Sequence, residues 1–173
     1  MKKILAISGS TKAVSTNALY ITAISKLLGG DFEVLNFPSI ADIPHFNPDL
    51  DQENPPQAVE ELRSTIQKAD GIIISTPEYA MGLPGSLKNL LDWTVSSASF
   101  SGKPLLALVA STQGEKAYQS IIDILTVIDA RVSPQLISFA KAKINNDGAI
   151  TDQETLAVLK STVDSFVASI ENG

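Results

Sequence analysis

The sequence of 173 residues contains no cysteine and a single histidine, His45. The absence of cysteine excludes disulfides, thiolate nucleophiles and metal centres with cysteine ligands. One histidine is too few for a metal site built from several histidines, and it leaves one candidate base for a Ser-His-Asp triad. We therefore expect no metal site, and any redox chemistry has to come from a bound cofactor.

Long apolar runs and excess positive charge are also missing. The first apolar run ends at Ile7, which is too short for a signal peptide, and no run approaches the roughly 20 residues of a membrane span. The formal net charge of −6 argues against nucleic-acid and acidic-membrane partners, since phosphate groups bind to a cationic face. We expect a cytoplasmic protein with neither kind of partner.

What is present is a composition typical of a packed domain. Hydrophobic residues make up 44% of the chain and charged residues 18%, which indicates a globular fold and not a disordered one. The sequence shows no internal repeat and no linker. We expect one domain that spans residues 1–173.

Short apolar runs alternate with longer amphipathic stretches. The runs predict strands at 4–7, 32–35, 71–75, 104–109 and 135–139. The stretches predict helices at 16–28, 56–66, 84–97, 117–128 and 152–170, and a long polar loop covers 38–56. This alternation favours an α/β fold in three layers, a doubly wound parallel sheet of five strands in the order 2-1-3-4-5.

Such sheets bind ligands beyond the carboxyl ends of their strands, near the point where the strand order reverses. The loop at 8–17 leads into a helix N-terminus, where Ser10, Ser15 and Asn17 add donors and Lys12 adds a positive charge. This suits a phosphate monoester. The alternative is an ordinary strand-to-helix connection capped by Ser15 or Thr16.

Two further loops of unusual composition follow the predicted third and fourth strands. In the loop at 76–85, prolines and glycines fix the backbone, while Tyr79 and Met81 offer flat, polarizable surface to a heterocycle. The loop at 111–115 combines small polar residues with Gly114, which permits close approach of a planar ligand. Taken alone, the loop at 76–85 is equally consistent with a rigid turn, and the loop at 111–115 is better explained as a plain loop. Together with the loop at 8–17 they predict a ligand site.

Several residues outside these loops have structural interpretations. We expect His45 to be exposed and the pair Glu60-Glu61 to be solvated. Trp93 follows an apolar helix face, which indicates core packing or a subunit contact. Lys88 and Asp92 have the i, i+4 spacing of a surface ion pair.

The motifs of this sequence resemble those of the NADPH-dependent FMN reductase family, from residue 3 to about residue 140. The motifs are Ser8-Gly9-Ser10 with Ser15-x-Asn17, Pro77-Glu78-Tyr79, Pro84-Gly85-x-Leu87-Lys88-Asn89-x-Leu91-Asp92-Trp93 and Gly102-Lys103-Pro104. The resemblance implies a flavodoxin-like fold, noncovalent FMN and NADPH or NADH as donor. It also implies a small-molecule acceptor, such as a flavin or a quinone, and a homodimer or homotetramer.

The same resemblance implies the residues that bind the cofactor, and no catalytic residue. It places the FMN phosphate on Ser10, Lys12, Ser15, Thr16 and Asn17. It places the isoalloxazine ring and ribityl chain against Pro77, Glu78, Tyr79 and Ala80, with Ser111, Thr112 and Gly114 closing the site.

We therefore expect an enzyme that passes hydride from NAD(P)H through bound FMN to the acceptor. One alternative is a noncatalytic electron carrier of the flavodoxin type. Another is a family member that has lost FMN and acts as a binding module. That alternative is motivated by Lys12 where the family commonly has Arg, by Ala80 where it usually has Asn, and by Glu115 in place of a second glycine.

Overall fold

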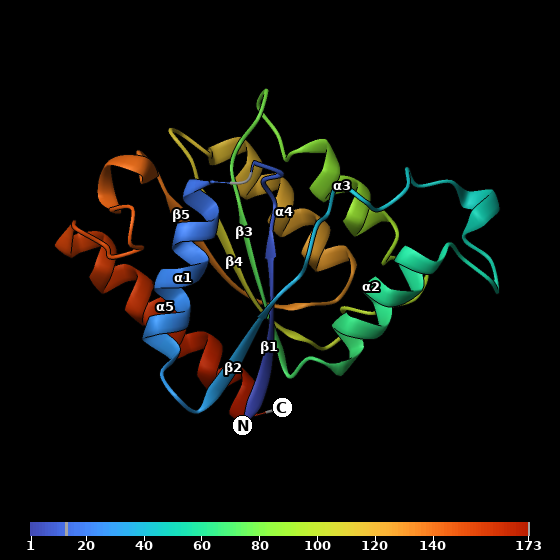
Figure 1. Ribbon diagram of the computed structural model, residues 1–173, viewed down its shortest axis with the longest axis horizontal. Coiled ribbons are helices and arrows are strands. Elements are labelled where there is room, and N and C mark those ends of the chain that lie inside the picture. Colours follow the sequence, from blue (N-terminus) through green and yellow to red (C-terminus); the bar gives the residue numbers. More distant parts are fainter. Residues whose placement is uncertain (13, 173) are drawn as a thin grey trace.

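Five parallel strands form one sheet in the computed structural model, which describes residues 1–12 and 14–172. Their order is β2-β1-β3-β4-β5, which confirms the predicted topology (Figure 1). The strands are β1 (Lys2–Ser8), β2 (Phe32–Asn36), β3 (Gly71–Thr76), β4 (Pro104–Ala110) and β5 (Arg131–Ile137). Because the strands are parallel, their carboxyl ends share one edge of the sheet, the upper edge in Figure 1.

Helices cover both faces of this sheet and complete a three-layer α/β fold of the flavodoxin type. One face carries α1 (Thr16–Leu28) and α5 (Gln153–Glu171), as Figure 1 shows. The other face carries α2 (Gln57–Lys68), α3 (Gly85–Asp92) and α4 (Glu115–Val127). Two short 3₁₀ turns, η1 (Pro48–Leu50) and η2 (Ala140–Lys143), lie in connections. None of the described helices is long and apolar enough to cross a membrane.

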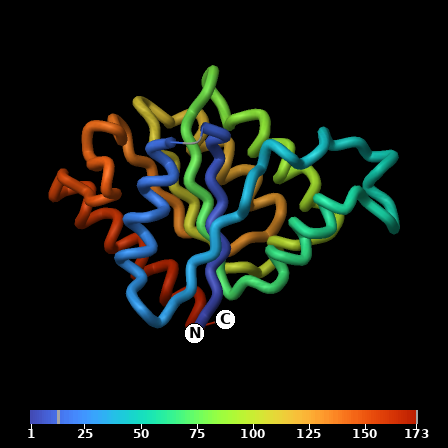
Figure 2. The backbone as a smooth tube through the Cα atoms, in the orientation of Figure 1, coloured from blue at the N-terminus to red at the C-terminus, as the bar shows by residue number. Residues whose placement is uncertain are grey.

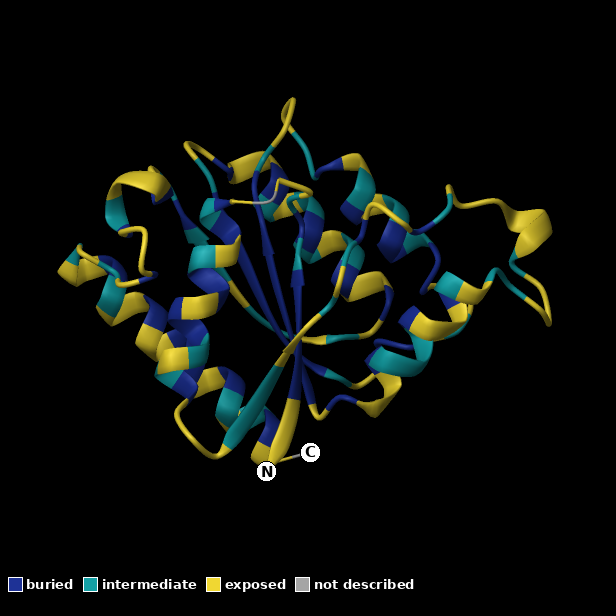
Figure 3. Cartoon of the chain, in the orientation of Figure 1, coloured by how far each residue is buried: buried dark blue, intermediate teal, exposed yellow. Residues whose placement is uncertain are grey.

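The central strands are apolar along their whole length because helices cover them on both sides. Every residue of β3 and β4 is buried, and Figure 3 shows these strands in dark blue. Along β3, Ile72 and Ile74 pack toward α2, α3 and α4, whereas Ile73 packs toward α1 and α5. This alternation follows from the two-residue period of a strand.

Two helices on the same face begin at side-chain caps. Ser15 caps α1, which spans the predicted residues, and its Oγ accepts a hydrogen bond from the amide of Ala18 at 3.1 Å. Asp152 caps α5 in the same way, with the amide of Thr155 as donor at 2.8 Å. Hydrogen bonds from the side chain and the amide of Thr155 hold the pKa of the Asp152 carboxyl below its usual value.

The predicted bounds of two elements were wrong. The last strand covers Arg131–Ile137 and not 135–139, because Pro134 interrupts the pattern in sequence but is tolerated in an edge strand. The third helix ends at Asp92 and not at residue 97. There Thr94 Oγ1 donates to the carbonyl of Leu91 and Ser97 Oγ donates to the carbonyl of Thr94, so these hydroxyls compete with helical hydrogen bonding.

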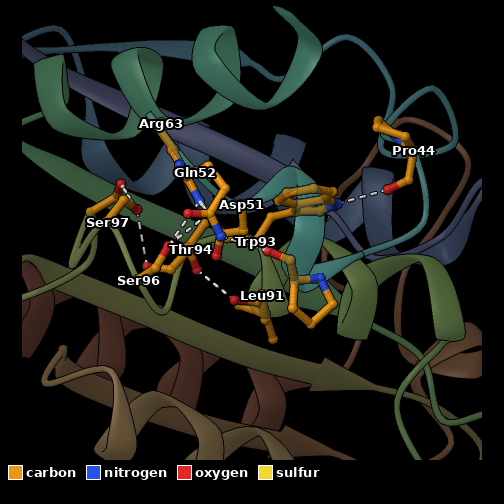
Figure 4. A network of polar contacts seen from close by, with 11 residues as sticks. Pro44, Asp51, Gln52, Arg63, Leu91, Trp93, Thr94, Ser96 and Ser97 are labelled. Atoms are coloured by element: carbon orange, nitrogen blue, oxygen red, sulfur yellow. Dashed lines mark hydrogen bonds and ion pairs between the residues drawn. The ribbon is translucent and has the colours of Figure 1, made fainter. Parts of the chain in front are cut away.

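The proline-rich connection between β2 and α2 is tied to α2 and α3 by polar contacts. Trp93 is fully buried, so core packing is the correct one of its two predicted roles, and its Nε1 donates to the carbonyl of Pro44 at 2.7 Å. Arg63 donates to the carbonyl of Trp93 and pairs with Asp51 at 2.7 Å (Figure 4). Asn89, a residue of the third motif, holds the same loop through its contacts with Pro44 and Phe46.

The expectations for isolated surface residues are confirmed. His45, Glu60 and Glu61 are exposed. Lys88 and Asp92 form the expected i, i+4 ion pair on α3.

Candidate functional site

The three loops of unusual composition meet at the carboxyl edge of the sheet. Gly9, which follows β1, donates its amide to the carbonyl of Ser75 on β3 at 2.7 Å. A Cβ on Gly9 would lie 2.4 Å from Thr76 Oγ1, so only glycine allows the first loop to cross β3 so closely. The Glu78 amide donates to Ser111 Oγ at 3.2 Å and joins the second loop to the third.

A cavity of about 650 Å³ opens between these loops. All but two of the predicted binding residues line it: Ser10, Lys12, Ser15, Thr16, Asn17, Pro77, Glu78, Tyr79, Ser111 and Thr112. The two that do not are Ala80, which is exposed in the turn of a hairpin, and Gly114, which is buried at the start of α4.

The first loop, which leads from β1 to α1, has the donors that an anion needs. Ser15 Oγ is engaged by the amide of Ala18, whereas the amides of Thr16 and Asn17 precede the first hydrogen bond of α1 and have no partner within the helix. The N-terminal end of α1 also attracts negative charge. Lys12 is exposed at the same end of the cavity.

Asn17 is turned toward the sheet. It is 3% exposed, its Nδ2 donates to the carbonyl of Ala110 at 3.3 Å, and its Oδ1 accepts from Ser75 Oγ at 2.9 Å. One side chain thus joins the start of α1 to the ends of β3 and β4. Asn17 therefore fixes the floor of the cavity, in addition to lining it.

The second loop contains a two-residue β-hairpin, the green turn that projects above the sheet in Figure 1. Tyr79 and Gly82 exchange backbone hydrogen bonds of 3.0 and 3.1 Å. Between them Ala80 and Met81 have φ angles of 48° and 64°, a left-handed conformation that Asn and Gly adopt more readily. The hairpin holds Tyr79 at the mouth of the cavity, where its side chain is half exposed.

Glu78 uses its carboxylate to cap a helix. Its Oε2 accepts hydrogen bonds from the amides of Lys116 and Ala117, each at 2.9 Å, in the first turn of α4. The negative charge also interacts favourably with the N-terminus of that helix. Glu78 therefore fixes the second loop against α4, and its carboxylate is already engaged.

Gly114 has a structural role at the start of α4. Its φ is 116°, and a Cβ there would lie 2.7 Å from Leu136 Cδ1. A side chain is excluded both by this contact and by the backbone conformation. Glu115 follows as an exposed residue of the first turn and does not line the cavity.

A fourth wall of the cavity comes from the connection after β5, which sequence reasoning missed. It includes Phe139, Lys141 and Asn146. The prediction placed the ligand only on the loops after the first, third and fourth strands, although the same rule applies to the carboxyl end of β5. Tyr20 anchors this wall from α1 through a 3.0 Å hydrogen bond to the carbonyl of Ala140. Burial, with a smaller contribution from Asp152, raises the pKa of Tyr20 to about 12.

The cavity has a positive charge balance in an acidic chain. Its charged lining residues in the described part of the chain are Lys12, Lys141 and Glu78. Backbone amides compensate the Glu78 carboxylate, which leaves the lysines to attract an anion. The described residues contain no group of three His, Cys, Asp or Glu side chains that could hold a metal ion.

These features fit FMN, because an anion-binding loop at a helix N-terminus lines the cavity together with Tyr79 and the residues of two further loops. Fold and cavity together define a flavodoxin-like flavoprotein. The chain belongs to the NADPH-dependent FMN reductase family, whose model matches residues 2–143. It is accordingly an FMN-dependent oxidoreductase with a nicotinamide donor.

Individual relatives agree with this assignment. The chain is 33% identical to a quinone reductase of Escherichia coli strain K12, over 95% of this chain and 93% of the relative. It is also 33% identical to NADH-dependent flavin reductase subunit 2 of Lactobacillus johnsonii, over 98% and 97%.

Among solved structures, the flavoenzyme NAD(P)H:(acceptor) oxidoreductase FerB of Paracoccus denitrificans superposes with a TM-score of 0.86. The sequence identity is 29%, and the match covers 99% of this chain and 98% of FerB. These relatives are reductases, which favours the enzyme over the electron carrier and the binding module.

Proposed function

We propose that this chain, as a single domain of residues 1–173, reduces a quinone or a free flavin with electrons from NAD(P)H. The observation that carries the proposal is the cavity at the carboxyl edge of the sheet, which is lined both by an anion-binding loop and by Tyr79. When bound, FMN supplies the hydride chemistry, and the chain supplies binding, orientation and exclusion of water.

The phosphate of FMN is proposed to bind at the start of α1. Ser10, Lys12 and Thr16 are available there with hydroxyl, ammonium and backbone donors. Ser15 supports this end as the cap of α1, and Asn17 supports it through its contacts with β3 and β4.

The ring and ribityl chain are proposed to lie between the second and third loops. Pro77, Tyr79, Ser111 and Thr112 line that part of the cavity. Glu78 fixes the second loop against α4, and Gly114 allows the close backbone turn at the start of α4. Ala80 is part of the hairpin that presents Tyr79. We assign no catalytic residue, because hydride transfer between stacked rings requires no general acid or base from the protein.

The acceptor is proposed to be small and planar. The cavity mouth is flanked by Tyr79 and Phe139, whose exposed fractions are 53% and 65%. Exposed aromatic rings suit an aromatic acceptor that alternates with the nicotinamide. Ping-pong kinetics are therefore expected, and an obligatory ternary complex would contradict this arrangement.

Self-association as a homodimer or homotetramer in the cytoplasm is part of the proposal. Met81 at the tip of the hairpin is 65% exposed beside Tyr79, an apolar surface that a second copy could cover. Light scattering after gel filtration measures the mass directly. A monomer at micromolar concentration would contradict the oligomer and leave the reductase activity unaffected.

The decisive experiment is an absorbance spectrum of the protein after mixing with excess FMN and gel filtration. We expect the flavin band to elute with the protein and to bleach when NADPH is added without oxygen. Lys12→Gln should elute with less flavin, whereas the exposed Lys160→Gln on α5 serves as the matched control. Failure of the wild-type protein to retain flavin would contradict the proposal.

A further inference from the structure

One residue of the cavity wall after β5, Phe139, has a backbone conformation that its side chain disfavours. Its φ and ψ angles are 53° and 33°, in the left-handed region. Asn and Gly enter that region readily, whereas a bulky residue there is an outlier that the surrounding structure has to maintain. Such outliers are concentrated at functional sites, so the strain at Phe139 points to a function of its side chain.

Backbone hydrogen bonds hold Phe139 in this conformation. Phe139 donates its amide to the carbonyl of Thr112, and Ala140 donates its amide to the carbonyl of Ser111, each at 3.0 Å. Tyr20 donates its hydroxyl to the carbonyl of Ala140, also at 3.0 Å. In Figure 2 this segment is the orange turn beside the upper end of α1. The third loop and α1 therefore fix the position of Phe139 without any packing of its ring.

The ring of Phe139 contributes little to the core. It is 65% exposed and belongs to neither of the two clusters of buried side chains, yet it lines the cavity. Among the residues that the structure describes, the one pair of aromatic rings in contact is Phe46 with Trp93. The rings of Phe139 and Tyr79 therefore do not stack on each other, and their faces are open to a ligand.

Ser111 connects the two aromatic sides of the cavity mouth. Its Oγ accepts a hydrogen bond from the amide of Glu78 at 3.2 Å, and its carbonyl accepts the one from Ala140. Tyr79 follows Glu78 in the chain, and Phe139 precedes Ala140. One residue of the third loop thus sets the separation between the two backbone segments that carry the rings.

We propose that Phe139 is a specificity-determining residue, which selects flat aromatic acceptors by contact between its ring and theirs. The inference rests on the proposed function and adds the residue that decides between acceptors. Aromatic rings attract one another beyond the area that they bury, so a planar ring is favoured over an acceptor without one. In the reaction, NAD(P)H gives up a hydride, and the quinone takes its two electrons and its proton, with a second proton from water, to become the hydroquinone.

The test compares two acceptors: menadione, which has a flat fused ring, and ferricyanide, a compact inorganic ion without one. With ping-pong kinetics, kcat/KM for an acceptor reports only the half-reaction in which that acceptor is reduced. Phe139→Leu removes the flat ring and is expected to lower the ratio of kcat/KM for menadione to that for ferricyanide about three- to tenfold. Phe139→Tyr keeps a flat ring and should hold the ratio within about twofold of the wild-type value.

Phe139→Gly adds a readout that does not depend on activity. Glycine removes the ring, so the ratio should fall as it does in Phe139→Leu. It also removes the Cβ that makes the left-handed conformation unfavourable, so the midpoint of urea denaturation should rise. Val158→Gly, at an exposed position within α5, is the matched control, and it should lower the midpoint and leave the ratio unchanged. A damaged fold would not combine higher stability with lower selectivity.

A ratio that is unchanged in Phe139→Leu and Phe139→Gly would overturn the inference, as would a ratio that falls equally in Phe139→Tyr. A midpoint that falls in Phe139→Gly as it does in Val158→Gly would remove the strain on which the inference depends, and would also overturn it. If the wild-type protein reduces neither acceptor with NADPH, the proposed function fails and the inference falls with it. If it reduces both and the ratio ignores residue 139, only the inference is wrong.

Discussion

At the scale of single residues, the hairpin beside the cavity is held in a conformation that its sequence disfavours. Ala80 and Met81 both have positive φ, and a residue with a Cβ loses roughly 1 kcal/mol or more in that region. The strain is maintained by the paired hydrogen bonds of Tyr79 and Gly82 and by the anchoring of Glu78 to α4. The hairpin therefore lowers the stability of the folded protein but fixes the position of Tyr79.

Replacing Ala80 with Asn should relieve part of this strain. Asn tolerates the left-handed region, so Ala80→Asn is expected to raise the free energy of unfolding by about 0.5–1 kcal/mol. Urea denaturation measures the change. The same substitution at Ala157, on an exposed turn of α5, should lower stability by roughly 0.5 kcal/mol. Equal effects at both positions would show that the turn conformation is not the cause.

Glu78 offers a second test at this scale. Glu78→Ala removes the acceptor of two amides in α4 and is expected to reduce stability by about 1–2 kcal/mol. Because the second loop then loses its anchor, the Kd for FMN should rise about tenfold. Glu115→Ala, in the same first turn but exposed, should change neither quantity appreciably. Partial recovery of FMN affinity in Glu78→Gln, whose amide oxygen still accepts, would support the positioning role.

At the scale of elements, the proline-rich connection is held in place by a partly buried ion pair between Asp51 and Arg63. Burial by itself would raise the pKa of Asp51, but hydrogen bonds from Arg63 and Ser96 outweigh it and hold that pKa below its usual value. Arg63 also reaches the carbonyl of Trp93, so α2, α3 and the connection are joined at one point (Figure 4).

This ion pair predicts an acid-sensitive part of the stability. Because the pKa of Asp51 is lower in the folded protein, its contribution is present above about pH 4 and is lost as the pH falls through the folded value. Urea denaturation between pH 6 and pH 3 should show a shallower loss of stability in Asp51→Asn than in the wild-type protein. Asp49→Asn in the same segment should retain the wild-type pH dependence.

The order and type of the elements could be predicted because apolar runs and amphipathic stretches alternate without interruption. The strand with Pro134 was misplaced because a proline in an edge strand resembles a break. The wall with Phe139 and Lys141 was missed for a different reason, because the prediction placed the ligand only on the loops after the first, third and fourth strands.

Residue types predicted the loops that form the cavity, but not what each side chain does there. The role of the buried Asn17 amide depends on Ser75, and the role of the Glu78 carboxylate depends on the amide of Lys116. Both partners are distant in sequence. Sequence spacing contains no information on those partners. The division between residues that line the cavity and residues that support it therefore required the structure.

At the scale of the whole molecule, cofactor binding and folding are linked. A ligand that binds only the folded state stabilises it by about 2.7 kcal/mol when its free concentration is a hundred times its Kd. We therefore expect FMN at that concentration to raise the Tm by about 5–10 °C. Differential scanning calorimetry with and without FMN measures the shift. Riboflavin at the same concentration should give a smaller shift, because it lacks the phosphate that the α1 end of the cavity is proposed to bind.

The proline in β5 has a consequence beyond the misplaced strand. A free sheet edge can pair with the edge of another chain and continue the sheet, which leads to fibres or to dimers joined strand to strand. Pro134 is exposed on the outermost strand, and its nitrogen cannot donate to an incoming backbone. Growth of the sheet across β5 is thus interrupted at its centre, and copies of this chain that meet at this edge have to do so through side chains.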